Sequence, residues 1–140
     1  MPCLEITMPQ TTAETKTALA EKLTIIFSEA TGMGADIFAI HFNEYNSGEV
    51  SIGGKIWNGG ESRPYLHFML YCPRLKRSVK QIIIKKMTLA FAESVGNPDW
   101  KPVIHIDEHP YDNVGVEGKL LSDAYEACAK AEFYYSLPKD

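Results

Sequence analysis

Pro2, in the opening segment MPCLEI, is the first residue whose type and position could do chemistry. A small residue after an initiator methionine usually permits removal of that methionine, and the proline would then carry a free secondary amine. Terminal amines have a pKa of about 8, and burial or nearby cations lower that value because they disfavour the protonated form. Such an amine could act as a base, an acid or a nucleophile. The plainer interpretation is a proline without a role.

Two arginines, Arg74 and Arg77, form an RxxR pattern in the most basic stretch of the chain, RLKRSVK (74–80). The pattern lies where the second predicted helix begins. Guanidinium groups beside the exposed N–H groups of a helix start could bind a carboxylate through paired hydrogen bonds. The alternative is an ordinary solvated first turn.

His105 and Glu117 are further candidates for acid–base chemistry. His105 lies in IHIDE (104–108), which nearly repeats IHFNE (40–44), so His41 occupies the matching position. A histidine on a strand is more often a packed or hydrogen-bonded residue than a catalyst. Glu117 lies in the glycine-containing segment VGVEG, for which a surface loop is the simpler interpretation.

Composition limits the classes of function that remain. The chain has 140 residues, 45% hydrophobic and 23% charged residues, and a net charge of −4, which together predict one soluble domain. Nucleic acid is not expected as a partner, because phosphate binding needs a concentrated basic surface. No apolar run is long enough to span a membrane, and no secretory signal is recognisable. The spacing of the three cysteines favours reduced thiols in a cytoplasmic protein, without a disulfide or a metal site; they are Cys3, Cys72 and Cys128.

An internal repeat organises the chain. The segment EKLTIIFSEATG (21–32) aligns without a gap on KKMTLAFAESVG (85–96). Each segment has helical spacing of apolar residues, and a glycine suited to end a helix follows, Gly32 in one and Gly96 in the other. The expected apolar stripes are Leu19, Leu23, Ile26 and Ala30 in the first helix, and Ile83, Met87, Ala90 and Ser94 in the second.

Strand-like segments flank both helices, so the chain is predicted to form a β-α-β unit twice. The expected strands are CLEITM (3–8), IFAIHFNEY (37–45), YLHFMLY (65–71) and VIHIDE (103–108). The expected order is a first β-α-β unit over about 2–46, a hairpin at 48–61, a second β-α-β unit over about 64–108, and a C-terminal loop and helix at 109–140, the helix over roughly 119–133. Long crossovers require parallel pairing within each unit. The predicted fold is therefore α/β (α+β in some schemes), a four-stranded sheet with both helices on one face.

Two consequences follow for assembly and for the site. The sheet face without helices carries His41 and His105 beside apolar residues, so it is expected to pack against other copies of the chain. Pro2 begins the first strand and the RLKR run follows the third. These residues are therefore expected near one edge of the sheet.

These residues and their order resemble the tautomerase superfamily, and within it the cis-3-chloroacrylic acid dehalogenase-like group, which includes oxalocrotonate tautomerase-like relatives. The segments that carry the resemblance are ATGMGADIFAIHFNEYNSGEVSIGG (30–54) and HIDEHPYDNV (105–114), together with Pro2 and RxxR. The resemblance implies a homotrimer, a catalytic amino-terminal proline, arginines that bind a substrate carboxylate, and no metal or organic cofactor. Carried over by position, Pro2 is the catalytic proline, Arg74 and Arg77 are the arginine pair, and Glu117 is the water-activating acid.

Two departures from the dehalogenase pattern shift the expected activity. This chain has Phe27 where that group has a histidine, and His105 where it has a tyrosine. Proline with arginine suffices for enol–keto proton transfer, so a tautomerase acting on a small carboxylate substrate is the preferred prediction. One alternative is a hydratase or dehalogenase of short unsaturated acids that uses Glu117 and His105. The other is a trimeric binding protein without catalytic activity.

Overall fold

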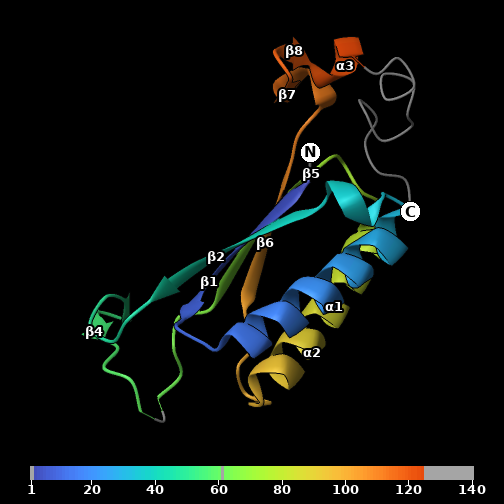
Figure 1. The fold of residues 1–140 in the computed structure, drawn as a ribbon. Coiled ribbons are helices and arrows are strands. Elements are labelled where there is room, and N and C mark those ends of the chain that lie inside the picture. The colour runs from blue at the N-terminus through green and yellow to red at the C-terminus, as the bar shows by residue number, and fades with distance from the viewer. Residues whose placement is uncertain (1, 61, 125–140) are drawn as a thin grey trace.

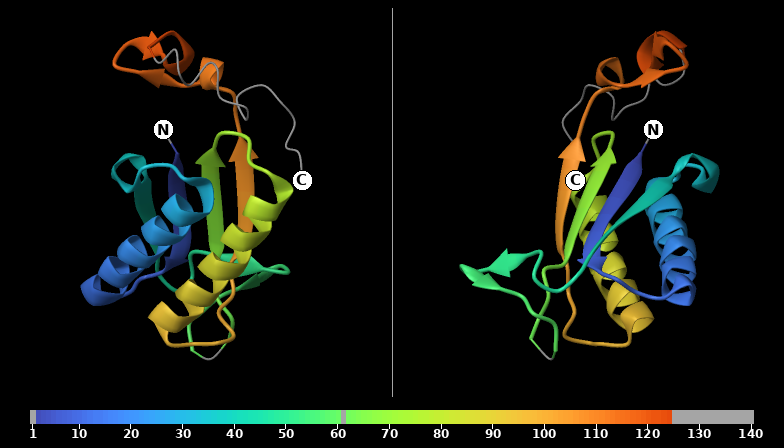
Figure 2. Two further views of the ribbon diagram at one scale, coloured as in Figure 1. Left: turned by 90° about the vertical axis from the view of Figure 1, so that its right-hand side faces the viewer. Right: turned by 60° about the vertical axis from the view of Figure 1, so that its left-hand side comes forward.

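The computed structural model describes residues 2–60 and 62–124, and its centre is a four-stranded sheet covered by two helices (Figure 1). The strands are β1 (Cys3–Pro9), β2 (Ala39–Tyr45), β5 (His67–Cys72) and β6 (Val103–Glu108), and the helices are α1 (Ala13–Thr31) and α2 (Arg77–Val95). The sheet order is β2-β1-β5-β6. Both helices lie on the same face of the sheet (Figure 2). The predicted fold of two β-α-β units is therefore confirmed.

The pairing of the central strands gives the sheet two edges that are related by the repeat. β1 is parallel to β2, β5 is parallel to β6, and β1 is antiparallel to β5. β1 and β2 begin at the same end of the sheet at which β5 and β6 finish. Pro2 lies at this end, which we call the proline edge. β5 and β6 begin at the opposite end, where Leu66 directly precedes β5, and we call that end the leucine edge.

Both long helices end as the sequence predicts. Gly32 (φ 75°) and Gly96 (φ 71°) adopt the left-handed conformation that glycine tolerates best. The helix starts differ from each other. Thr12 caps α1 through its hydroxyl oxygen, which accepts a hydrogen bond from the Thr15 N–H at 3.1 Å. Lys76, at the corresponding position of α2, makes no side-chain cap.

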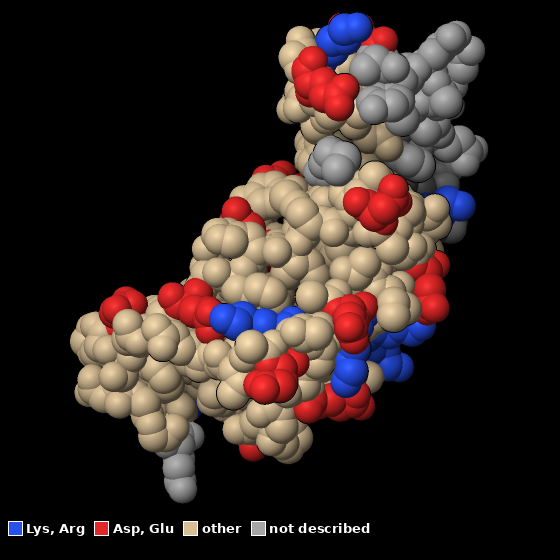
Figure 3. All heavy atoms as spheres, in the orientation of Figure 1, with Lys and Arg blue, Asp and Glu red and all other residues tan. Residues whose placement is uncertain are grey.

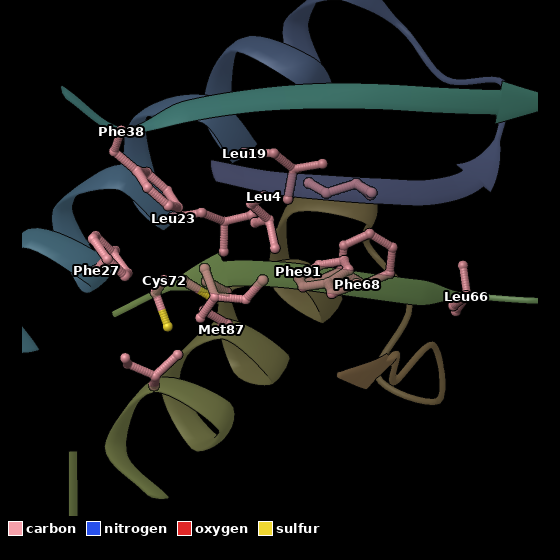
Figure 4. Close-up of a cluster of buried hydrophobic side chains, with 14 of the residues drawn as sticks. Leu4, Leu19, Leu23, Phe27, Phe38, Leu66, Phe68, Cys72, Met87 and Phe91 are labelled. Atoms are coloured by element: carbon pink, nitrogen blue, oxygen red, sulfur yellow. The ribbon is translucent and has the colours of Figure 1, made fainter. Parts of the chain in front are cut away.

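The core lies between the helices and the covered face of the sheet (Figure 4). Its fully buried helix residues are Leu19, Leu23, Phe27, Ile83, Met87 and Phe91. The predicted stripes are confirmed at Leu19, Leu23, Ile83, Met87 and Ala90, which are buried. They omitted Phe27 and Phe91, which are fully buried, whereas the predicted Ile26 and Ala30 are only partly buried at the margin of the core. Phe27 stacks on Phe38 with ring centroids 4.3 Å apart, and burial of a side chain of this size stabilises the fold by roughly 1.5–3 kcal/mol.

Among the described residues, two small hairpins lie outside the main sheet. The first, β3 (Ser51–Ile52) with β4 (Lys55–Ile56), falls in the predicted hairpin at 48–61. The second, β7 (Gly115–Val116) with β8 (Lys119–Leu120), was not predicted. It turns at Glu117 (φ 53°) and Gly118 (φ 80°), a pair of left-handed residues typical of tight hairpins.

The second hairpin corrects the start of the predicted final helix. Residues 119 and 120 belong to β8, and helix α3 begins only at residue 121 (Leu121–Ala124). The rest of the predicted helix at 119–133 lies outside the described residues. Short 3-10 helices complete the chain at Ala35–Ile37 and Tyr111–Asn113. Within the described ranges, no helix is long and apolar enough to cross a membrane.

Candidate active site

Pro2 is buried and lies directly before β1 at the proline edge. Its carbonyl oxygen accepts a hydrogen bond from the Ala39 N–H at 3.4 Å, which ties it to the start of β2. On the other side, Cys3 lies opposite Tyr71 near the end of β5. The backbone that carries Pro2 is therefore fixed between two strands.

The arginine segment lies at the same edge, because β5 ends beside the start of β1. After Cys72 the chain turns through residues 73–76 and enters α2 at Arg77. Arg74 is half-buried and Arg77 is exposed. The Arg77 side chain forms no hydrogen bond or ion pair with another described residue. A helix start without a side-chain cap attracts anions, and the cationic Arg77 strengthens that preference.

Glu108, at the end of β6, holds this turn in place. One carboxylate oxygen accepts a hydrogen bond from the Leu75 N–H, between the two arginines, and the other pairs with the Lys80 ammonium; both distances are 2.5 Å. Glu108 and Lys80 were not among the site residues predicted from the sequence. The repeat contained the signal, since Glu44 and Lys16 occupy the matching positions of the first unit and form the same pair.

Three side chains at this edge, Cys3, Cys72 and His109, have pKa values shifted toward their neutral forms. Burial, and secondarily Glu108, raises the pKa of the Cys72 thiol to about 12. Burial, and secondarily Glu5, raises the pKa of the Cys3 thiol, so neither thiol is a nucleophile near neutral pH. His109 follows β6, and its backbone N–H donates to the Cys72 carbonyl at 3.0 Å. Burial lowers the pKa of its imidazole. His109 is thus a neutral imidazole at this edge that the sequence reasoning did not select.

His105 lies elsewhere, on the face of the sheet without helices. It is opposite Met69 and three residues before the end of β6. Its Nδ1 lies 2.6 Å from Nε2 of His67, so the two imidazoles form a hydrogen-bonded pair. His41 is exposed on the same face, in β2.

Glu117 is exposed in the turn of the β7–β8 hairpin. This hairpin projects beyond the end of the sheet (Figures 1 and 2). Within one chain the structure thus brings Pro2, Arg74 and Arg77 to one edge, and it does not bring His105 or Glu117 to Pro2.

The surface charges and the possible metal ligands of the described residues indicate no further site at this edge. Lys and Arg side chains are interspersed with Asp and Glu over the face shown in Figure 3. Among the residues with described positions, no group of three or more His, Cys, Asp or Glu side chains is placed to hold a metal ion. The groups at this edge that could take part in chemistry are therefore Pro2, two guanidinium groups and a neutral imidazole.

Comparison with protein families gives a match for the second half of the chain. Residues 64–124 match the Tautomerase family, described as tautomerase enzyme. That segment includes Arg74, Arg77 and Glu108. The resemblance to the tautomerase superfamily is confirmed.

Several solved structures have the same fold and align with most of this chain. A fused 4-OT wild-type asymmetric trimer has a TM-score of 0.73 and 20% identity, over 87% of this chain and 98% of that one. N1, a member of the cis-3-chloroacrylic acid dehalogenase family, has a TM-score of 0.69 and 17% identity, over 92% of each chain. Malonate semialdehyde decarboxylase has a TM-score of 0.69 and 14% identity, over 86% and 94%. At such identities the likeness establishes the fold, and no curated protein matches the sequence.

Proposed function

We propose that this protein is a tautomerase in which the amine of Pro2, freed by removal of Met1, moves a proton between the enol and keto forms of a small 2-oxo acid. The observation that supports this most strongly is the shared edge. Pro2 lies at the start of β1, and Arg74, Arg77 and the α2 start lie beside it. The Tautomerase match over 64–124 agrees with this proposal.

The substrate carboxylate binds to the arginines and to the N–H groups at the start of α2. Arg77 supplies an exposed guanidinium, and Arg74 lies three residues earlier in the turn held by Glu108. This anchoring places the enol next to Pro2. The proline nitrogen removes the proton of the enol hydroxyl, the carbonyl forms, and the same proton is returned to the neighbouring carbon.

Burial makes the amine suitable for this step. Pro2 is buried, and the neighbouring thiols and His109 all favour their neutral forms for the same reason. Desolvation disfavours a protonated amine, and the arginine charges act in the same direction. We therefore expect the pKa of the processed Pro2 amine to lie below the usual value of about 8 for a chain terminus.

The active form is proposed to be a homotrimer of about 47 kDa, three chains of 15.7 kDa each. The sheet face without helices carries the half-buried Met69 and Tyr71 beside the histidines. An uncovered face that is not uniformly polar favours association. The fused 4-OT structure with the same fold is a trimer, and light scattering that finds a stable monomer at micromolar concentration would argue against this assembly.

The decisive experiment compares processed protein with a form that retains Met1. Ketonisation of phenylenolpyruvate or a 2-hydroxy-2,4-dienoate is measured for both, and the proline nitrogen is titrated by NMR in the processed form. Retention of Met1 should abolish activity, because an amide nitrogen is not basic. Pro2→Ala keeps a terminal amine and should weaken activity without abolishing it. Equal rates in the two forms would show that Pro2 is not the catalyst.

Hydration or hydrolytic dehalogenation of a short unsaturated acid is the second candidate. His109 favours it, because a neutral imidazole at the proline edge could activate water. Two structural neighbours are in line with this possibility: N1 belongs to the cis-3-chloroacrylic acid dehalogenase family, and malonate semialdehyde decarboxylase is described with hydratase activity. Halide release from 3-haloacrylates, assayed beside enol ketonisation, distinguishes the two candidates.

A further inference from the structure

A cavity of about 450 Å³ lies at the leucine edge, on the other side of the molecule from Pro2. The β3–β4 hairpin forms one wall, and the starts of β5 and β6 form the other. In Figures 1 and 2 this hairpin projects at the end of the sheet opposite the N-terminus. The lining residues that carry the inference are Lys55, Trp57, Arg63, Tyr65, Leu66 and Val103.

The repeat places this cavity where the second β-α-β unit should have its own site. The Leu66 carbonyl accepts a hydrogen bond from the Val103 N–H at 3.0 Å, as the Pro2 carbonyl does from Ala39 at 3.4 Å. Leu66 is therefore the structural equivalent of Pro2 in the second unit. Its nitrogen is a peptide amide within the chain and cannot be a base. A site at this edge could bind a ligand but could not transfer a proton through that position.

The cavity walls are apolar and well fixed. Four of the nine large apolar side chains exposed among the described residues line it: Ile52, Ile56, Tyr65 and Val103. Trp57 packs edge-on against Tyr45 at 5.6 Å and donates its indole N–H to the Ser62 carbonyl at 3.1 Å. The buried Tyr45 hydroxyl donates to the Tyr65 carbonyl at 2.5 Å. Walls held in this way lose little freedom when a ligand binds.

The charged groups that line the cavity are both cations. Lys55 belongs to the hairpin, and Arg63 lies on the segment that leads into β5. Arg63 donates one N–H to the Lys101 carbonyl at 2.5 Å, which fixes the guanidinium and leaves its other donors for a ligand. None of the described lining residues is acidic. The cavity is thus complementary to an anion with an apolar body.

We propose that this cavity is a second binding site, separate from the proline edge, for an amphipathic carboxylate. The apolar body of the ligand packs on Trp57 and Tyr65, and its carboxylate pairs with Arg63 and Lys55. This inference goes beyond the proposed tautomerase activity, because it needs no basic amine at Pro2.

The test titrates full-length protein with 3-phenylpropionate and follows the indole N–H signal of Trp57 by NMR. The neutral amide of the same acid serves as the matched ligand. Arg63→Met should weaken binding at Trp57 about tenfold or more, because it removes a charge-assisted hydrogen bond. Arg77→Met, at the other edge, should leave the Trp57 titration unchanged, and so should retention of Met1. Failure of the proposed catalysis therefore leaves this result intact.

Any one of three outcomes would overturn the proposal. The Trp57 signal would not respond to the acid at millimolar concentration, the acid and its amide would bind equally, or Arg63→Met would bind the acid as tightly as the wild type. A parallel sedimentation experiment with Ile56→Asp identifies the competing occupant. A fall in mass with this variant, combined with no response of wild-type Trp57, would mean that a second copy of the chain fills the cavity.

Discussion

Glu44 at the end of β2 and Glu108 at the end of β6 make the same two contacts at opposite edges of the sheet. Glu44 accepts hydrogen bonds from the Thr11 N–H at 2.7 Å and from Lys16 at 2.8 Å. Glu108 accepts them from the Leu75 N–H and from Lys80. Each partner of one glutamate occupies the repeat position that matches a partner of the other. The duplication has thus kept the ion pair that fastens each helix start to the end of its second strand.

The chemistry around the two ion pairs is different. Leu66 stands where the other edge has Pro2, and the positions equivalent to Arg74 and Arg77 are Gln10 and Ala13. Thr12 caps α1, whereas no side chain caps α2 at Lys76. Features that both edges share hold the fold together, and features of one edge alone are the candidates for function. This difference supports the proposal that the proline edge is the catalytic one.

Replacement of either arginine should have the largest effect on activity. Arg77→Ala or Arg74→Ala removes the proposed charge-assisted contact to a substrate carboxylate, worth about 1.5–3 kcal/mol. Steady-state kinetics on an enol substrate should therefore show kcat/KM lowered tenfold or more, with unfolding by urea little changed. Lys22→Ala is the control, because Lys22 lies mid-helix in α1 and pairs weakly with Glu93 at 4.0 Å. If both arginine variants keep wild-type kinetics, the RLKR run is a solvated helix start.

Glu108→Ala and Glu44→Ala form a matched pair that separates support of the fold from support of the site. Each variant loses an ion pair and a hydrogen bond to a backbone N–H, so both should lower the free energy of unfolding by about 1–3 kcal/mol. Only Glu108→Ala should raise KM several-fold, with kcat changed less, because only this carboxylate holds the turn that carries the arginines.

Glu108→Gln tests whether this effect is one of positioning. Its amide oxygen can still accept the hydrogen bond from the Leu75 N–H, so KM should recover toward the wild-type value although the charge is lost. Equal KM values for Glu44→Ala and Glu108→Ala would show that Glu108 does not position the arginines for substrate binding.

The sequence predicted the framework well because the repeat carries strong local signals. Helical periodicity and the two C-terminal glycines located α1 and α2, and β6 has the predicted bounds of 103–108. The shared edge of Pro2 and the RLKR run also followed from the order of the strands. The structure confirms that placement.

Features that depend on contacts between distant segments were missed. The pairing of Glu108 with Lys80 requires the end of β6 to meet the start of α2, and local propensity says nothing of that contact. The β7–β8 hairpin turns at Glu117, a residue that adopts a left-handed backbone less readily than glycine does. The pairing of His105 with His67 depends on the register of two strands that are distant in the sequence.

The smallest predicted effect is on the pH dependence of stability and comes from the His67–His105 pair. The first unit lacks this pair, because Cys3 occupies the position that matches His67. The Nε2–Nδ1 contact of 2.6 Å needs at least one deprotonated nitrogen. Burial, and secondarily His105, lowers the pKa of His67 in the folded protein. Tyr65 stacks on His67 at 5.9 Å, and Thr7 on β1 and Val103 on β6 lie opposite it. The carboxylates on this face, Glu5 and Asp107, lie opposite Met69 and Tyr71 and do not offset the shift.

The unfolded chain therefore binds a proton at His67 more readily than the folded chain does. Linkage then requires the free energy of unfolding to be greatest above the unfolded pKa of about 6.5 and to fall as pH drops below it. Urea unfolding at a fixed protein concentration and a series of pH values measures this slope. His105→Gln should flatten the slope, because it removes the neighbouring charge that opposes protonation of His67. His41→Gln, on the same sheet face but outside the pair, should leave it unchanged. An identical slope in wild type and His105→Gln would show that the pair does not control stability in this pH range.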